Sequence, residues 1–243
     1  MSQQIVENII RIKERITIAC ENSYRDPKDV KLLLATKTVS EEYIEIALNA
    51  GHILIAENKV QELKEKFEKL KKIPHTNHFI GHLQSNKIKD LIKYNVTCIQ
   101  SLDRLSLAEK LHQHLEKEGR VLDVLIQVNT SFEDSKFGMS PRGVIELVRQ
   151  VAQFDTIKIK GLMTIGLLST DNEKVRRCFR LLKDIQKNIE VQQISNVQMT
   201  ELSMGMSGDL EIAVEEGATI VRVGTAIFGQ RSTPNSFYWN EGN

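Results

Sequence analysis

One lysine near the start of the chain has the surroundings of a reactive amine. Lys37 follows the apolar run 32–35 after a single threonine. Apolar surroundings lower the pKa of an amine because they disfavour its charged form. The neutral amine is the nucleophile that forms an imine with an aldehyde. By position alone, Lys37 is better explained as an exposed lysine at the end of a strand than as a reactive amine. A reactive role therefore depends on the groups that lie around it.

Two glycine-bearing turns near the other end of the chain have the composition of an anion site. They comprise residues 202–209 and 222–229, and each runs into an expected helix start. Backbone N–H groups in such a turn converge on an anion, and the helix dipole and hydroxyl groups add to the attraction. We therefore assign Ser207, Gly224 and Thr225 to a phosphate monoester, which carries about two negative charges near neutral pH. Ser207 taken alone also fits a helix N-cap without a ligand.

Short apolar runs alternate along the chain with longer segments of helical period, which is typical of a parallel sheet with helical crossovers. Eight runs have the composition of strands, at residues 31–36, 52–55, 77–80, 96–100, 121–128, 157–164, 197–201 and 219–223. Helix starts are expected at Ser40, Asp103, Ser140, Asp171 and Ser207. An additional N-terminal helix is indicated by four isoleucines that share one face, Ile5, Ile9, Ile12 and Ile16.

Eight strand and helix units predict an α/β fold, a closed (β/α)8 TIM barrel with an additional N-terminal helix. An open doubly wound sheet is the alternative, but no G-x-G-x-x-G turn follows the first expected strand. Because the chain has no Pro-rich or Gly/Ser-rich linker, we expect one domain over residues 1–243.

A closed barrel makes its first and last strands neighbours, and active sites gather at the C-terminal ends of the strands. Lys37 and the two glycine-bearing turns are therefore expected to face one cavity. Arg222 ends the last expected strand and is placed to reach into the same cavity. A buried salt bridge with a glutamate is the alternative role for this arginine.

Composition limits the classes of partner. The chain has 33 basic and 32 acidic residues, so no strong field would attract nucleic acid or an anionic membrane. We expect a cytoplasmic protein, because the sequence shows no leader and no membrane span.

Alternating Lys and Glu over residues 60–72 indicate a solvated helix face. No metal site is expected: Gly81 separates His78 from His82, and the three cysteines, expected to be reduced and mostly buried, lie far apart in the chain.

Several motifs together resemble the pyridoxal phosphate homeostasis protein family, which looks like the N-terminal barrel of alanine racemase without its second domain. The resemblance covers nearly the whole chain. Its motifs are Ala-Thr-Lys-Thr at 35–38, Glu-Asn-Lys-Val-Gln-Glu at 57–62, His-Phe-Ile-Gly-His-Leu-Gln-Ser-Asn-Lys at 78–87, Ser-Lys-Phe-Gly at 135–138, Leu-Ser-Met-Gly-Met-Ser at 202–207 and Arg-Val-Gly-Thr-Ala-Ile-Phe-Gly at 222–229.

The resemblance implies that pyridoxal 5'-phosphate is held as a Schiff base on Lys37. It places Arg222 near the pyridine nitrogen and gives the phosphate to Ser207, Gly224 and Thr225. The resemblance also implies that further residues line the pocket, namely Asn58, His82, Ser203 and Met204.

Three functions remain open: a non-catalytic carrier in intracellular cofactor homeostasis, an amino-acid racemase, and a lyase that forms a Schiff base with a sugar phosphate. A racemase needs a base on each face of the α-carbon, and only Lys37 is a candidate. Arg222 is always protonated, so it would keep the pyridine ring neutral and make it a weaker electron sink. We therefore favour the carrier, without catalytic residues, as a monomer that hands its cofactor to pyridoxal phosphate-dependent apoenzymes.

Overall fold

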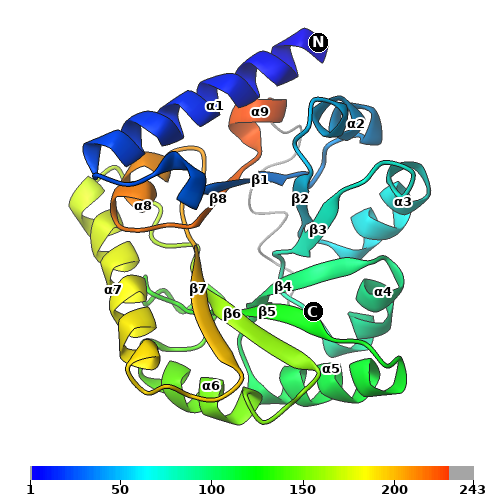
Figure 1. Ribbon diagram of the computed structural model, residues 1–243, viewed down its shortest axis with the longest axis vertical. Helices are drawn as coiled ribbons and strands as arrows, with labels where there is room; N and C mark the ends of the chain where they lie inside the picture. The colour runs from blue at the N-terminus through cyan, green and yellow to red at the C-terminus, as the bar shows by residue number, and fades with distance from the viewer. Residues whose placement is uncertain (1, 230–243) are drawn as a thin grey trace.

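The protein is described here by a computed structural model that covers residues 2–229, in which eight parallel strands close into a barrel (Figure 1). The ring closes where β1 pairs with β8, for example Leu33 with Arg222. The expected (β/α)8 TIM barrel is confirmed. Its strands follow one another in chain order: β1 (Lys31–Ala35), β2 (Leu54–Glu57), β3 (Thr76–Phe79), β4 (Val96–Leu102), β5 (Leu122–Gln127), β6 (Ile157–Met163), β7 (Val197–Ser203) and β8 (Ile220–Val223).

Helices form an outer ring around the strands (Figure 1). They are α2 (Glu41–Asn49), α3 (Val60–Leu70), α4 (Ile88–Lys93), α5 (Leu105–Lys117), α6 (Val144–Val151), α7 (Asn172–Glu190), α8 (Leu210–Glu215) and α9 (Thr225–Phe228). Three short 3-10 helices lie in connecting segments, at Pro27–Asp29, Ser85–Lys87 and Pro141–Gly143. No helix of residues 2–229 is long and apolar enough to cross a membrane.

The additional helix α1 (Ser2–Asn22) lies outside the barrel, against α2, α8 and α9. The side chains of Ile5, Ile9, Ile12 and Ile16 are all buried, as their spacing predicts. Polar contacts at two points fix the helix. The guanidinium of Arg15 binds both carboxylate oxygens of Glu211, at 2.6 and 2.9 Å, and Asn8 Nδ2 donates to the carbonyl of Ile227 at 2.9 Å.

Some expected boundaries are wrong. The expected strand 52–55 begins two residues later, because the N–H of His52 bonds to the carbonyl of Ala47 and so closes the turn after α2. Helix α8 begins at Leu210 with Asp209 at its N-cap, so Ser207 does not start a helix. Arg104, not Asp103, is the N-cap of α5. The other expected starts are confirmed, at Ser40 for α2, Asp171 for α7 and Ser140 for the 3-10 turn before α6.

Inside the barrel, a small apolar cluster separates the two open ends. It consists of Leu33, Ala56, Cys98, Leu125, Met163 and Ile220. The three cysteines are all buried and unpaired, as expected. Burial raises the pKa of the Cys98 thiol, which keeps it protonated and unreactive.

Candidate cofactor-binding site

Four of the expected site residues meet in a narrow cavity of about 90 Å³ at the C-terminal ends of the strands. Lys37 is the second residue after β1, Asn58 directly follows β2 and His82 is the third residue after β3, while Arg222 reaches in from β8. Parallel strands bring these positions together because their C-terminal ends share one face of the barrel. The remaining lining residues are Ile80, Gly81, Gln127, Phe137, Met163, Ile165 and Met206.

A second cleft, of about 540 Å³, lies over the junction of β1 and β8 and is lined by Lys37, Gly224 and Thr225. Lys37 therefore lines both spaces. The close approach of the two strands requires a glycine at this point, because a Cβ atom on Gly224 would lie 2.7 Å from the carbonyl oxygen of Ala35. Tyr43 of α2 also lines the cleft, and no sequence motif had pointed to it.

Ser207 lies beside the same turn. Its Oγ accepts a hydrogen bond from the N–H of Ala226 at 3.4 Å, next to Thr225. The structure thus brings Ser207 close to Gly224 and Thr225, as the phosphate assignment requires. Because α9 has only four residues, the helix dipole expected to assist the anion is small, and the N–H and hydroxyl groups have to supply most of the attraction.

Arg222 is a buried cation whose partners are uncharged. Its Nη1 donates to Ser203 Oγ at 2.7 Å and its Nη2 to the carbonyl of Thr164 at 2.8 Å. Within residues 2–229 no carboxylate forms an ion pair with this side chain, so the alternative of a salt bridge with a glutamate is not realised there. Burial lowers the pKa of Arg222 to about 10, and Asp209 opposes the shift, so the group stays protonated at neutral pH.

A chain of hydrogen bonds runs from Arg222 through the inside of the barrel. Ser203 Oγ accepts from Arg222 and donates to Gln100 Oε1 at 2.6 Å, and Gln100 Nε2 lies 2.8 Å from His78 Nδ1. Because a guanidinium and an amide NH₂ can only donate, His78 Nδ1 has to accept. The proton of the neutral imidazole is therefore on Nε2. From the sequence, His78 was weighed only as a metal ligand, and no motif indicated Gln100.

The burial of His78 predicts a pH-dependent contribution to stability. Burial, together with the charge of Lys31, lowers the pKa of His78 from 6.5 to about 4. Between these values the unfolded chain binds more protons, so stability falls as the pH falls. Between pH 7 and pH 5 we expect the free energy of unfolding in urea to fall by about 2 kcal/mol more in the wild type than in His78→Gln. His114→Gln, on α5, should behave as the wild type, and equal losses in all three proteins would contradict the assignment.

His82 is held from two sides at the mouth of the barrel. Its ring stacks on Phe137, with centroids 3.8 Å apart, and its Nδ1 lies 3.7 Å from Asp103 Oδ2. Burial alone would raise the pKa of Asp103, but the nearby His82 and the charge and hydrogen bond of Arg104 lower it, so the carboxylate is charged. Asn58 Oδ1 is buried without a hydrogen-bond partner among the described residues. These groups fit a ligand that places a polar ring atom or a hydroxyl group in the narrow cavity.

Two residues that the resemblance assigned to the pocket lie behind its wall. Ser203 is fully buried and reaches the cavity only through Arg222. Met204 is also fully buried, and its side chain belongs to the apolar core around the barrel.

A buried ionic cluster, comprising Glu57, Glu62 and Lys66, fixes the backbone on both sides of Lys37. Lys66 Nζ donates to the carbonyl of Thr36 at 2.9 Å and to Glu57 Oε1 at 2.7 Å. Glu62 Oε2 accepts from Lys66 Nζ at 2.8 Å and from the N–H of Thr38 at 2.6 Å. The solvated face expected for residues 60–72 is therefore wrong at Lys66, whose side chain is only 8% exposed.

The turn that presents Lys37 is strained. Thr38 has a φ of 62°, a left-handed conformation that is costly for a β-branched residue. The hydrogen bond from its N–H to Glu62 opposes this cost. Strain of this kind persists where surrounding contacts hold it, and here the buried ionic cluster supplies those contacts.

Comparison with known proteins agrees with this geometry. The family model of the alanine racemase N-terminal domain matches residues 24–232. A pyridoxal phosphate homeostasis protein of Aquifex aeolicus is 44% identical over 225 residues, which are 93% of this chain and 97% of the relative. The chain belongs to the pyridoxal phosphate homeostasis protein family. The family member of that name in Escherichia coli is 34% identical over 93% of this chain and 97% of its own length.

Solved structures of related proteins share the barrel of this family. PipY of Synechococcus elongatus, solved with pyridoxal phosphate bound, has a TM-score of 0.78 and 34% identity, over 90% of this chain and all of that one. A protein of unknown function from Bifidobacterium adolescentis has a TM-score of 0.88 and 37% identity over 93% of this chain and 95% of its own. Alanine racemase of Clostridium difficile, at 13% identity and a TM-score of 0.74 over 96% of this chain and 58% of its own, shows a common fold alone.

Proposed function

We propose that this protein holds pyridoxal 5'-phosphate on Lys37 and stores or delivers it without turnover. The observation that carries the proposal is the position of Lys37 between two spaces of different character. Asn58, His82 and Arg222 line the narrow cavity on one side, and Gly224 and Thr225 line the cleft on the other. The names of the relatives and the cofactor bound to PipY support the same assignment.

The residues present fit the two ends of this cofactor. Bound pyridoxal 5'-phosphate supplies an aldehyde that condenses with a lysine amine, and a pyridine ring that can withdraw electrons. Lys37 provides the amine, while Ser207, Gly224 and Thr225 provide hydroxyl and N–H donors for the phosphate. Arg222, held by Ser203 and by the carbonyl of Thr164, would donate a hydrogen bond to the ring nitrogen.

The donor at Arg222 favours a carrier over a racemase. A guanidinium that remains charged disfavours protonation of the ring nitrogen and so weakens the ring as an electron sink. The structure does bring one further titratable group, His82, to the cavity. This imidazole stacks on Phe137 and faces Asp103, so both contacts hold it against the wall.

Deuterium exchange tests the absence of turnover. We expect the loaded protein to exchange the α-proton of L-alanine in D₂O no faster than free cofactor does at the same concentration. The reason is that Arg222 suppresses electron withdrawal and His82 is held in place. Exchange well above the free cofactor, lost in His82→Gln, would establish a racemase with Lys37 and His82 as its two bases. An authentic alanine racemase serves as the positive control.

We further propose that the carrier acts as a monomer in the cytoplasm and hands the cofactor to apoenzymes. The cleft beside Lys37 opens at the C-terminal face of the barrel, where no part of residues 2–229 forms a second domain over it. A recipient could therefore approach the site directly.

A further inference from the structure

Arg222 is held at the narrow cavity by two uncharged groups. Its Nη2 donates to the backbone carbonyl of Thr164 and its Nη1 to Ser203 Oγ. Ser203 is therefore the only side chain of residues 2–229 that hydrogen-bonds this guanidinium. Because Ser203 is fully buried, solvent does not replace the contact. The orientation of the Ser203 hydroxyl group thus decides how well the arginine is held.

The hydroxyl group of Ser203 has a proton of its own that needs an acceptor, since its bond to Arg222 uses only a lone pair. Gln100 Oε1 accepts this proton, at 2.6 Å from Ser203 Oγ, and the side chain of Gln100 is fully buried. If the amide group of Gln100 were turned over, its NH₂ group would face Ser203, and the buried hydroxyl would lose this acceptor. The carbonyl of Gln100 is therefore needed on the side of Ser203.

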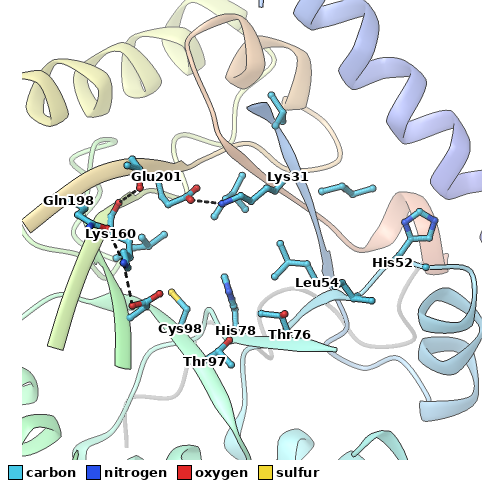
Figure 2. Close-up of a pocket in the computed structure, with 18 of the residues that line it drawn as sticks. Lys31, His52, Leu54, Thr76, His78, Thr97, Cys98, Lys160, Gln198 and Glu201 are labelled. Carbon is cyan, nitrogen blue, oxygen red and sulfur yellow. Dashed lines mark hydrogen bonds and ion pairs between the residues drawn. The ribbon is translucent and has the colours of Figure 1, made fainter. Parts of the chain in front are cut away.

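His78 fixes the direction in which this amide group faces. Its Nδ1 accepts from Gln100 Nε2 at 2.8 Å, so the NH₂ group of Gln100 stays on the side of His78 and the carbonyl on the side of Ser203. The ring of His78 points into a cavity of about 700 Å³ at the N-terminal ends of the strands (Figure 2). The hydrogen-bond chain from Arg222 therefore crosses the barrel, and each of its polar atoms has one defined role as donor or acceptor.

A guanidinium is a rigid planar fork with five N–H groups, so two hydrogen bonds to it also set the directions of the other three. We propose that Gln100 is a positioning residue for the cofactor, an inference that rests on the proposed function. Gln100 accepts the proton of Ser203 and keeps a lone pair of this hydroxyl on Arg222. The guanidinium is thereby held where one of its remaining N–H groups donates to the pyridine nitrogen.

Two ligands separate this role from a general effect on folding. They are pyridoxal 5'-phosphate and its deaza analogue, in which a C–H group replaces the ring nitrogen. Both carry the aldehyde and the phosphate, but only the first can accept a hydrogen bond from Arg222 at this position. The affinity of each ligand for the full chain is measured by absorption titration, and the ratio of the two affinities is compared between variants. Differences in reactivity between the two free aldehydes cancel in this comparison.

In Gln100→Leu we expect the affinity for pyridoxal 5'-phosphate to fall about tenfold relative to that for the deaza analogue, the size of one hydrogen bond to a charged group. Gln100→Glu keeps an acceptor for Ser203 and should retain the ratio of the wild type. Ser203→Ala removes the link between Gln100 and Arg222 and should change the ratio as Gln100→Leu does. It also tests the proposal if Gln100→Leu does not fold. The double variant should show no further change, because Gln100 acts through Ser203.

The matched control is Gln186→Leu. Gln186 is a buried glutamine of α7 that donates to the carbonyl of Met199, outside both cofactor spaces. Its loss should lower the free energy of unfolding and leave the affinity ratio unchanged. Equal weakening of both ligands in Gln100→Leu would show a merely structural role and overturn the proposal, as would a ratio that changes equally in Gln186→Leu. If neither ligand forms a borohydride-reducible adduct with the wild type, the proposed function itself fails, and this inference with it.

Discussion

Lys37→Ala is expected to lose the covalently bound cofactor almost completely. The wild type, incubated with pyridoxal phosphate and gel-filtered, should show visible absorption that borohydride removes, and the variant should show neither. Lys37 is the one lysine that lines the cavity of Asn58, His82 and Arg222, so its loss leaves the aldehyde without an amine in reach within residues 2–229. Absorption spectra before and after reduction, with phosphate analysis, measure the effect.

The matched control is Lys136→Ala. Lys136 is also a lysine in a loop that follows a strand, but its ammonium binds Glu133 and the carbonyl of Gly166, at 2.7 Å from the latter. We expect this variant to keep the absorption of the wild type. If Lys37→Ala retained a reducible adduct and Lys136→Ala lost it, Lys37 would not be the anchor.

Lys66→Met should destabilise the protein by about 3–5 kcal/mol, because it leaves a buried carboxylate without its cation. Glu57 is 2% exposed, and its Oε2 already has no hydrogen-bond partner within the described chain. Burial raises the pKa of Glu57 to about 7, and Lys66 opposes the shift. Without Lys66 the pKa rises further. The free energy of unfolding in urea, compared with the wild type, measures the loss.

The pH dependence of the Lys66→Met penalty follows from the raised pKa of Glu57. A carboxyl group with a raised pKa in the folded state loses stability as the pH rises from its unfolded to its folded pKa, and removal of Lys66 extends this range for Glu57 to higher pH. The penalty should therefore be larger at pH 8 than at pH 6. Lys69→Met is the control on the same helix, because Lys69 pairs with Glu41 and Glu42 at the surface and its loss should cost far less than the loss of Lys66. Equal penalties in the two variants would contradict a buried ionic cluster.

The same cluster links stability to the proposed function. Lys66 and Glu62 hold Thr36 and Thr38, the two neighbours of Lys37. If the backbone relaxes at these positions in Lys66→Met, the strained turn at Thr38 relaxes as well. Lys66→Met should then hold the cofactor less tightly even under conditions in which the barrel stays folded.

The features that could be predicted from sequence are those that depend on local order. A strand end, the glycine turn that follows it and the next helix cap lie within a few residues of one another in the sequence. In a closed barrel, strands that follow one another along the chain are also neighbours in space. The eight strands were predicted in this way, and so was the meeting of Lys37, Arg222, Ser207 and Gly224 at one end of the barrel, while their role in cofactor binding stays a prediction. The resemblance added Asn58 and His82, which no local pattern had indicated.

The missed features depend on contacts between distant segments. The sequence does not distinguish Lys66 from the other lysines of a charged helix, and only its packing against β2 shows that it is buried. Gln100 and Ser203 are 103 residues apart and meet because both side chains point into the barrel. The resemblance assigned Met204 to the pocket, and its side chain is fully buried in the apolar core around the barrel.

Transfer to an apoenzyme is the most direct test of the carrier. The protein is loaded with pyridoxal phosphate, freed of unbound cofactor and mixed with an apoenzyme that requires it, and the recovered activity is followed over time. We expect full recovery with the loaded wild type, and none with the same protein after borohydride reduction or with Lys37→Ala treated identically. No recovery from the loaded wild type, where an equal amount of free cofactor restores activity, would contradict delivery from Lys37.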